Sequence, residues 1–97
     1  MISNFESSNI GLYQNYESGV SAYRNGDFDL AADCFSHAVK MNPQNWDAQF
    51  FLGMSLAQSK QEVAAAKIFM TIAENCPDEN FRRRARLARQ ALVVWRQ

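Results

Sequence analysis

The side chains best suited to catalysis or metal binding in this 97-residue chain are Cys34 and His37, which stand three residues apart. On a helix, that spacing brings a thiol and an imidazole onto one face, where they could form a nucleophilic pair or half of a metal site. The chain has no second histidine, and its other cysteine, Cys76, is predicted to end a different helix. Asp33 disfavours a thiolate at Cys34, because the two negative charges repel. We therefore expect no catalytic residue, no metal site and no cofactor.

Other patterns typical of catalysis are missing from the sequence. There is no glycine-rich loop that could cradle a phosphate and no pair of carboxylates spaced for acid–base work. Asp27 and Asp29 instead flank Phe28, at the predicted start of a helix, where aspartate is a favoured capping residue. We therefore predict that the chain is not an enzyme.

The charged residues are divided unevenly along the chain. Residues 1–79 hold all ten acids with four bases, whereas residues 80–97 hold six arginines and no acid, so the two parts carry net charges of −6 and +6. The arginines could form the solvated face of a helix, bind an acidic group of a partner, or meet the acidic part of a second copy. Nucleic acid is less favoured, because an apolar stripe on the same segment indicates a packed helix rather than a free basic arm.

Composition and length limit the class of protein. A chain of 97 residues with 47% hydrophobic residues is expected to form one small globular domain. No apolar run approaches the roughly 20 residues of a membrane-spanning helix. Residues 1–8 lack the basic and apolar regions of a secretory signal, and two cysteines are too few for a disulfide framework. We expect a cytoplasmic chain with reduced thiols and no membrane partner.

The chain repeats itself with a period of 34 residues, the distance between its only two prolines. Placing residues 12–45 on residues 46–79 aligns small, aromatic and helix-breaking residues, at positions where packing dictates the residue type. The identical pairs are Gly19 with Gly53, Ser21 with Ser55, Ala31 with Ala65, Ala32 with Ala66, Phe35 with Phe69, and Pro43 with Pro77.

Apolar residues in both copies recur at the spacing of an α-helix. Residues 28–39 and 65–76 each carry such a stripe, and a helix precedes each of them, so each copy is predicted to be a helical pair that ends before a proline. Gly26 is suited to the left-handed turn between the first two helices. After the second proline, Asp78 offers a helix cap, and a fifth helix follows with apolar residues at Phe81, Ala85, Ala88 and Leu92.

Gly19 and Gly53 lie inside predicted helices, where glycine costs about 1 kcal/mol relative to alanine. Two such glycines at one repeat interval indicate that another helix approaches closely at both positions. We expect the second helix of each pair to press Ala31 or Ala65 against the bare backbone.

This arrangement resembles a tetratricopeptide repeat array, whose 34-residue units contain a glycine, an Ala-x-x-x-Phe motif and a proline. The early tryptophan of the family is absent, since Asn15 and Gln49 stand in its place. The resemblance implies an all-α solenoid with two helix-turn-helix units, at 12–45 and 46–79, and an arginine-rich capping helix at 80–97. Residues 1–11 are expected to be a flexible extension or to lead into the first helix.

The resemblance also implies that the first helix of each unit lines a concave groove that binds a segment of another protein. Helical periodicity, applied to that groove, predicts an aromatic and aliphatic centre with one basic end. We therefore expect a partner segment with apolar anchors and acidic or C-terminal carboxylate groups. The predicted groove residues are Tyr16, Val20, Tyr23, Arg24, Asp47, Phe50, Met54, Gln58, Arg82, Arg86 and Arg89.

Two subtypes of the family offer narrower functions. One binds the C-terminal carboxylates of heat-shock chaperones, but its early Lys and Asn fall at Tyr16 and Val20, which cannot bind a carboxylate in that way. Its late pair could match Arg82 and Arg86 only if the fifth helix is offset by one residue, so we reject a complete site of this kind. Residues 47–54 resemble a segment of the chaperones of bacterial type III secretion translocators, which remains an alternative.

Two further alternatives stay open at this stage. The aromatic residues assigned to the groove, Tyr16 and Phe50 among them, could pack inside the domain, because a small rotation of each helix buries them. The chain could also be a structural module whose copies associate through the fifth helix.

Overall fold

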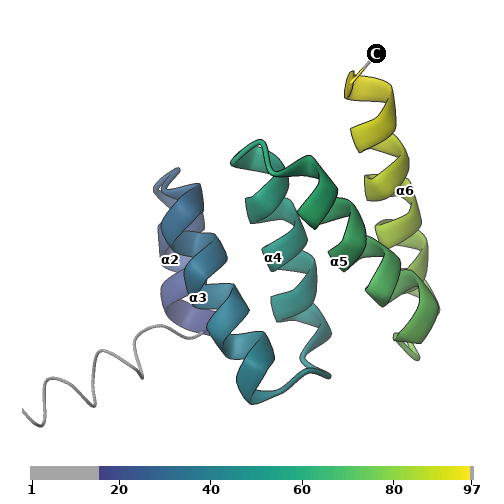
Figure 1. Cartoon of the computed structure of the whole chain (residues 1–97). Coiled ribbons are helices and arrows are strands. Elements are labelled where there is room, and N and C mark those ends of the chain that lie inside the picture. Colours follow the sequence, from purple (N-terminus) through teal and green to yellow (C-terminus); the bar gives the residue numbers. More distant parts are fainter. Residues whose placement is uncertain (1–15, 97) are drawn as a thin grey trace, which may run out of the picture.

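The computed structural model describes residues 16–96 and the side chains of residues 16–92. This part of the chain forms five α-helices and no strand, which confirms the predicted all-α helical repeat (Figure 1). The predicted N-terminal extension, residues 1–11, lies outside the described residues. The helices are α2 (Tyr16–Arg24), α3 (Phe28–Met41), α4 (Trp46–Gln58), α5 (Glu62–Asn75) and α6 (Glu79–Arg96).

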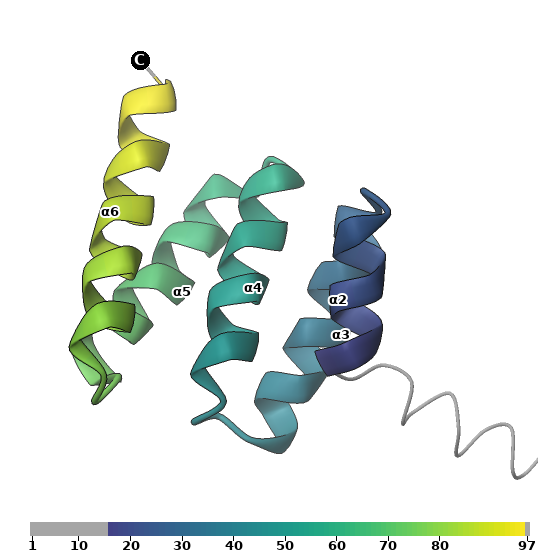
Figure 2. The same ribbon diagram turned by 180° about the vertical axis from the view of Figure 1, so that it is seen from behind.

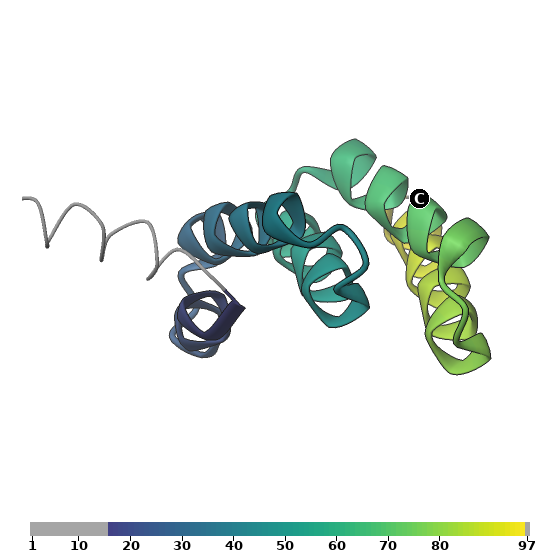
Figure 3. The same ribbon diagram turned by 90° about the horizontal axis from the view of Figure 1, so that it is seen from below.

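The helices form two layers. Seen end-on in Figure 3, α2, α4 and α6 lie in one row and α3 and α5 in the other. Figure 2 shows the row of α2, α4 and α6 in front. Each helix packs against the next one along the chain, and α4 also contacts α2 and α6. We call the α2–α4–α6 side the inner face and the α3–α5 side the outer face.

Short polar residues cap the N-termini of α3 and α4. Asp27 Oδ1 accepts from the backbone N–H of Leu30 (3.4 Å), and Asn45 Oδ1 accepts from that of Ala48 (3.1 Å). These bonds satisfy backbone donors that have no partner in the first turn of a helix. Asp27 therefore caps α3 at Phe28, as the sequence predicts.

The turns inside the two helical pairs share one backbone conformation. Gly26 has a φ of 79° and Lys60, at the matching position, has a φ of 65°. Glycine adopts this left-handed conformation freely, whereas a residue with a Cβ atom pays a steric cost. The second turn therefore carries strain that the first one avoids.

Phenylalanine rings pack directly against the two helical glycines. A Cβ atom on Gly19 would lie 2.7 Å from Cε1 of Phe35, and one on Gly53 would lie 2.6 Å from Cε1 of Phe69. The second helix of each pair therefore approaches the glycine closely, as predicted. The nearest atoms belong to the phenylalanine ring and not to Ala31 or Ala65, which are both fully buried.

The last helix repeats α4 with an offset of one residue. Gln49 Nε2 donates to the carbonyl oxygen of Pro43 (2.8 Å), and Arg82 Nη1 donates to that of Cys76 (2.7 Å). These two bonds are 33 residues apart in the sequence, whereas α3 and α5 are related by 34 residues. The connection after α5 is therefore one residue shorter, and every α6 side chain turns by about 100° from its place in a 34-residue alignment.

The ring-on-glycine contact makes Gly53→Leu a destabilising substitution. The larger side chain has to displace Phe69 from a buried site, which costs about 1–3 kcal/mol. Thermal unfolding followed by circular dichroism should show the melting temperature fall by roughly 5–20 °C. Glu74→Leu, at an exposed position of α5, is the control and should leave it nearly unchanged. A Gly53→Leu protein with the parental melting temperature would contradict the packing described above.

The strained turn predicts the opposite effect for Lys60→Gly. Removal of the Cβ atom at a positive φ should stabilise the fold by about 1 kcal/mol. The midpoint of urea unfolding measures this change. Lys40→Gly is the matched control, because Lys40 is exposed in the last turn of α3, where glycine is unfavourable. A Lys60→Gly midpoint equal to or below the parental one would show that the turn is unstrained.

Candidate functional site

A small apolar depression of about 140 Å³ opens on the inner face, where α2, α4 and α6 meet over α5. Most of its wall is aliphatic or aromatic, with Gln58 at its edge. Its lining residues are Tyr23, Met54, Ala57, Gln58, Phe69, Ala88, Ala91 and Leu92.

Three predicted groove residues line this depression, namely Tyr23, Met54 and Gln58. The predicted set lacks Ala57 and Phe69, together with the α6 residues of the lining. Ala88 and Leu92 belong to the apolar stripe of the fifth helix, so their burial is foreseeable from spacing. Their position beside Met54 depends on the offset of α6, which the repeat period does not reveal.

The tyrosines of α2 are held by rings of the neighbouring helices. Tyr16 packs edge-on against Phe35 and Phe51, with ring centroids 5.8 and 6.0 Å apart. Tyr23 contacts Phe28 at 5.1 Å and Phe51 at 5.7 Å. Edge-to-face contacts of this kind fix ring orientation. Both tyrosines therefore pack inside the domain, and Tyr23 also lines the inner depression.

The remaining predicted residues of α2 and α4 differ in exposure. Val20 is half-buried and packs on the core, whereas Arg24 is exposed. Phe50 is half-buried, with its ring 5.5 Å from that of Phe69 and 6.2 Å from that of Phe81. Asp47 is exposed, and the pKa of Tyr16 is raised by burial of the phenol and, to a lesser extent, by the charge of Asp47.

The three arginines predicted for the basic end of the groove lie away from the inner depression, since none of them lines it. With the one-residue offset, Arg82 and Arg86 of α6 correspond to Gln49 and Gly53 of α4, and Gly53 faces Phe69 of α5. On α6 this side is the end of the described stack (Figure 1). Arg89 lies on the same side, three residues after Arg86.

Arg82 and Arg86 are paired with Glu79 on this end of the stack. Each guanidinium lies 3.3 Å from a different carboxylate oxygen of Glu79. The hydrogen bond from Arg86, followed by the charge of Arg82, lowers the pKa of Glu79. The two arginines and Glu79 therefore form a charged cluster at the end of the described stack.

Two other α6 residues turn toward the inner face. Under the same offset, Arg83 corresponds to Phe50 and Leu87 to Met54. Both α6 side chains are exposed, Leu87 by 59%. The observed one-residue offset does not produce the match with a chaperone-carboxylate site, because the α6 residues equivalent to Tyr16 and Val20 are then Arg83 and Leu87, not Arg82 and Arg86.

The cysteine of the predicted thiol–imidazole pair is buried. Cys34 is 2% exposed, and the pKa of its thiol is raised by burial, then by Asp33 and Asp27. Asp33 thus disfavours the thiolate, as predicted. Among residues 16–96, no three metal-binding side chains come together.

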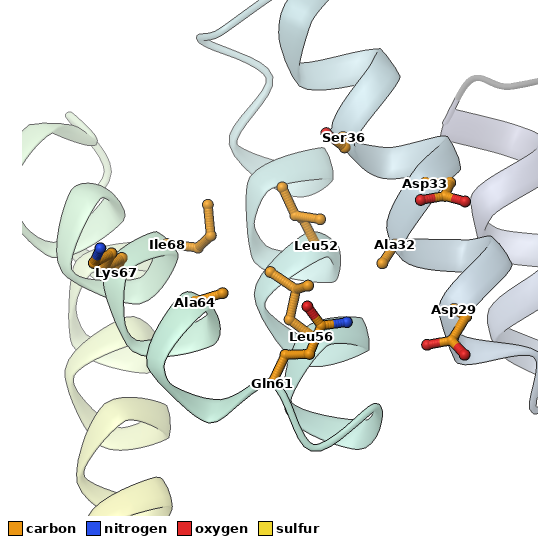
Figure 4. Close-up of a pocket in the computed structure, with 10 residues that line it drawn as sticks. All are labelled: Asp29, Ala32, Asp33, Ser36, Leu52, Leu56, Gln61, Ala64, Lys67 and Ile68. Carbon is orange, nitrogen blue, oxygen red and sulfur yellow. The ribbon is translucent and has the colours of Figure 1, made fainter.

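A second, larger depression of about 590 Å³ lies on the outer face between α3, α4 and α5. Figure 4 shows leucine and isoleucine side chains at its floor and two carboxylates of α3 along one side. None of the predicted groove residues lines this surface, because that prediction concerns the concave side of the helical array.

Comparisons with known proteins agree with this architecture. A family model described as tetratricopeptide repeat matches residues 16–80. No curated protein and no solved structure matches the chain. The suggested relation of residues 47–54 to secretion chaperones therefore stays a prediction. Among the described helices, none is both long and apolar enough to cross a membrane.

The Glu79 pair predicts a pH-dependent contribution to stability. Because the pKa of Glu79 is lowered from 4.5 in the folded state, its stabilising effect is complete above that value and is lost as the pH falls through the folded pKa. Glu79→Gln should therefore lower the urea midpoint at pH 7, and the difference from the parent should shrink below pH 4.5. Glu74→Gln serves as the control. A Glu79→Gln difference that is independent of pH would contradict the ion pairs as its cause.

Proposed function

Because the chain belongs to the tetratricopeptide repeat family, whose repeats generally mediate protein–protein interaction, we propose that it binds a partner segment on its inner face without chemistry. The observation that carries this proposal is the apolar depression between α2, α4 and α6. Its lining residues come from α2, α4, α5 and α6, so a ligand there contacts both repeat units and the last helix at once.

The depression suits one apolar side chain of the partner. Its volume of about 140 Å³ is too small for a helix and matches a single aliphatic or aromatic group. Met54 supplies a wall that adapts to different shapes, whereas Tyr23 and Phe69 are fixed by ring contacts. Burial of one leucine-sized group is worth about 1.5–3 kcal/mol, which is a large share of a weak peptide affinity.

Exposed arginines on the helices of the inner face favour an acidic partner. Arg24 on α2 and Arg83 on α6 are exposed on either side of α4, and neither forms an ion pair within the described residues. Arginines bind carboxylates through paired hydrogen bonds. We therefore assign the partner class as a segment with one apolar anchor and neighbouring Asp, Glu or C-terminal carboxylate groups.

Selection from a random dodecapeptide library on the purified protein tests this function. The recovered sequences should share one large apolar residue next to acidic residues. Their affinity, measured by fluorescence polarisation, should fall roughly 10- to 100-fold when the apolar residue is changed to alanine. Ala91→Phe, which fills the edge of the depression, should cause a similar loss.

The control is Gln90→Phe, at an exposed α6 position that does not line the depression. It adds the same ring to the same helix and should leave the affinity nearly unchanged. Recovered peptides whose binding is insensitive to Ala91→Phe, or a library that yields no binder, would contradict the proposed function.

A further inference from the structure

The outer depression combines an apolar floor with a one-sided acidic rim. Leu52 and Leu56 of α4 and Ile68 of α5 form its floor (Figure 4). Asp29 and Asp33, one turn apart on α3, line one side. A lysine of α5, Lys67, lines the opposite side.

Both carboxylates are available to a ligand. Asp29 and Asp33 are exposed, and neither forms a hydrogen bond or an ion pair with any residue in the range 16–92. An occupant that matches this surface has an apolar group for the floor, two cations toward α3 and no positive charge toward Lys67.

One face of α6 has this pattern of side chains. Leu87 is a large apolar residue that is 59% exposed. Arg83 and Arg84 precede it by four and three residues, and Gln90 and Ala91 follow it by three and four. Since residues at these spacings are neighbours on a helix, the face presents two cations, a leucine knob and an uncharged end. All five side chains are exposed.

We propose that this α6 face docks into the outer depression of a second copy of the chain. Leu87 covers the floor formed by Leu52 and Leu56, Arg83 and Arg84 pair with the two aspartates, and the uncharged end lies toward Lys67.

The contact has to be between copies. Within one chain, α6 packs on α5 and α4 in the inner layer, whereas the depression opens on the outer face (Figures 1 and 3). The overall charges agree, because residues 1–79 carry −6 and residues 80–97 carry +6. Since the two surfaces differ, the contact is head-to-tail and can extend to further copies.

The association goes beyond the proposed peptide binding and shares residues with it. Arg83 and Leu87 also border the inner face, so a copy whose α6 is docked presents a partly covered groove. Asp29 and Asp33 lie on the outer face and do not line the inner depression. Variants at these aspartates therefore separate the two activities.

Sedimentation velocity over a concentration series tests the proposal. The parental chain should rise above its monomer mass of 11.1 kDa as its concentration increases to about 300 µM. Added salt should reduce this association, since exposed charges contribute to it. Asp29→Arg with Asp33→Arg, Arg83→Asp with Arg84→Asp, and Leu87→Ser should each remain monomeric.

Mixing the two charge-reversed proteins gives the decisive comparison. Alone, each has like charges on both surfaces. Together, the acidic α6 of one meets the basic depression of the other, so an equimolar mixture should associate again. Glu74→Arg, which changes an exposed charge elsewhere on α5, should associate like the parent.

A parental chain that stays monomeric at this concentration would overturn the proposal. So would association that survives either charge reversal, or a mixture of the two folded variants that stays monomeric. Circular dichroism confirms that each variant is folded, and Leu87→Ser provides the test if a charge reversal unfolds the chain. Peptide affinity of Asp29→Arg with Asp33→Arg should equal that of the parent, so a failure here is distinguishable from a failure of the proposed function.

Discussion

A phenylalanine ring seated on a helical glycine determines how close the two helices of each pair can approach. Phe35 lies on Gly19 and Phe69 lies on Gly53, at distances that leave no room for a Cβ atom. Because both pairs use this contact, they have similar geometry and stack into an inner and an outer layer. Phe69 also forms part of the wall of the inner depression, so the same contact that sets the packing shapes the candidate binding site.

The repeat pattern predicts the helices and their layers well, because spacing, glycine and proline all report local packing. It does not predict which α6 side chains face the inner depression. The connection before α6 is one residue shorter than the connection before α4, and this turns every α6 side chain about the helix axis. For this reason Arg82 and Arg86 lie at the end of the described stack and do not line the inner depression. Periodicity likewise does not predict that Phe35, rather than Ala31, supplies the atoms nearest to Gly19.

The two faces of the stack offer different chemistry. The inner face has a small apolar depression, and the outer face has a larger apolar depression beside carboxylates. We propose these two surfaces as a site for a partner segment and a site for a second copy of the chain.

A double-mutant cycle on Gly53 and Phe69 tests the central contact most directly. Gly53→Ala should destabilise the parent, because its Cβ atom meets the ring at 2.6 Å, but should cost little when Phe69→Leu has already removed that ring. Equilibrium urea unfolding of the four proteins should therefore give a coupling free energy of about 1 kcal/mol or more. Additive effects, with a coupling near zero, would contradict the account.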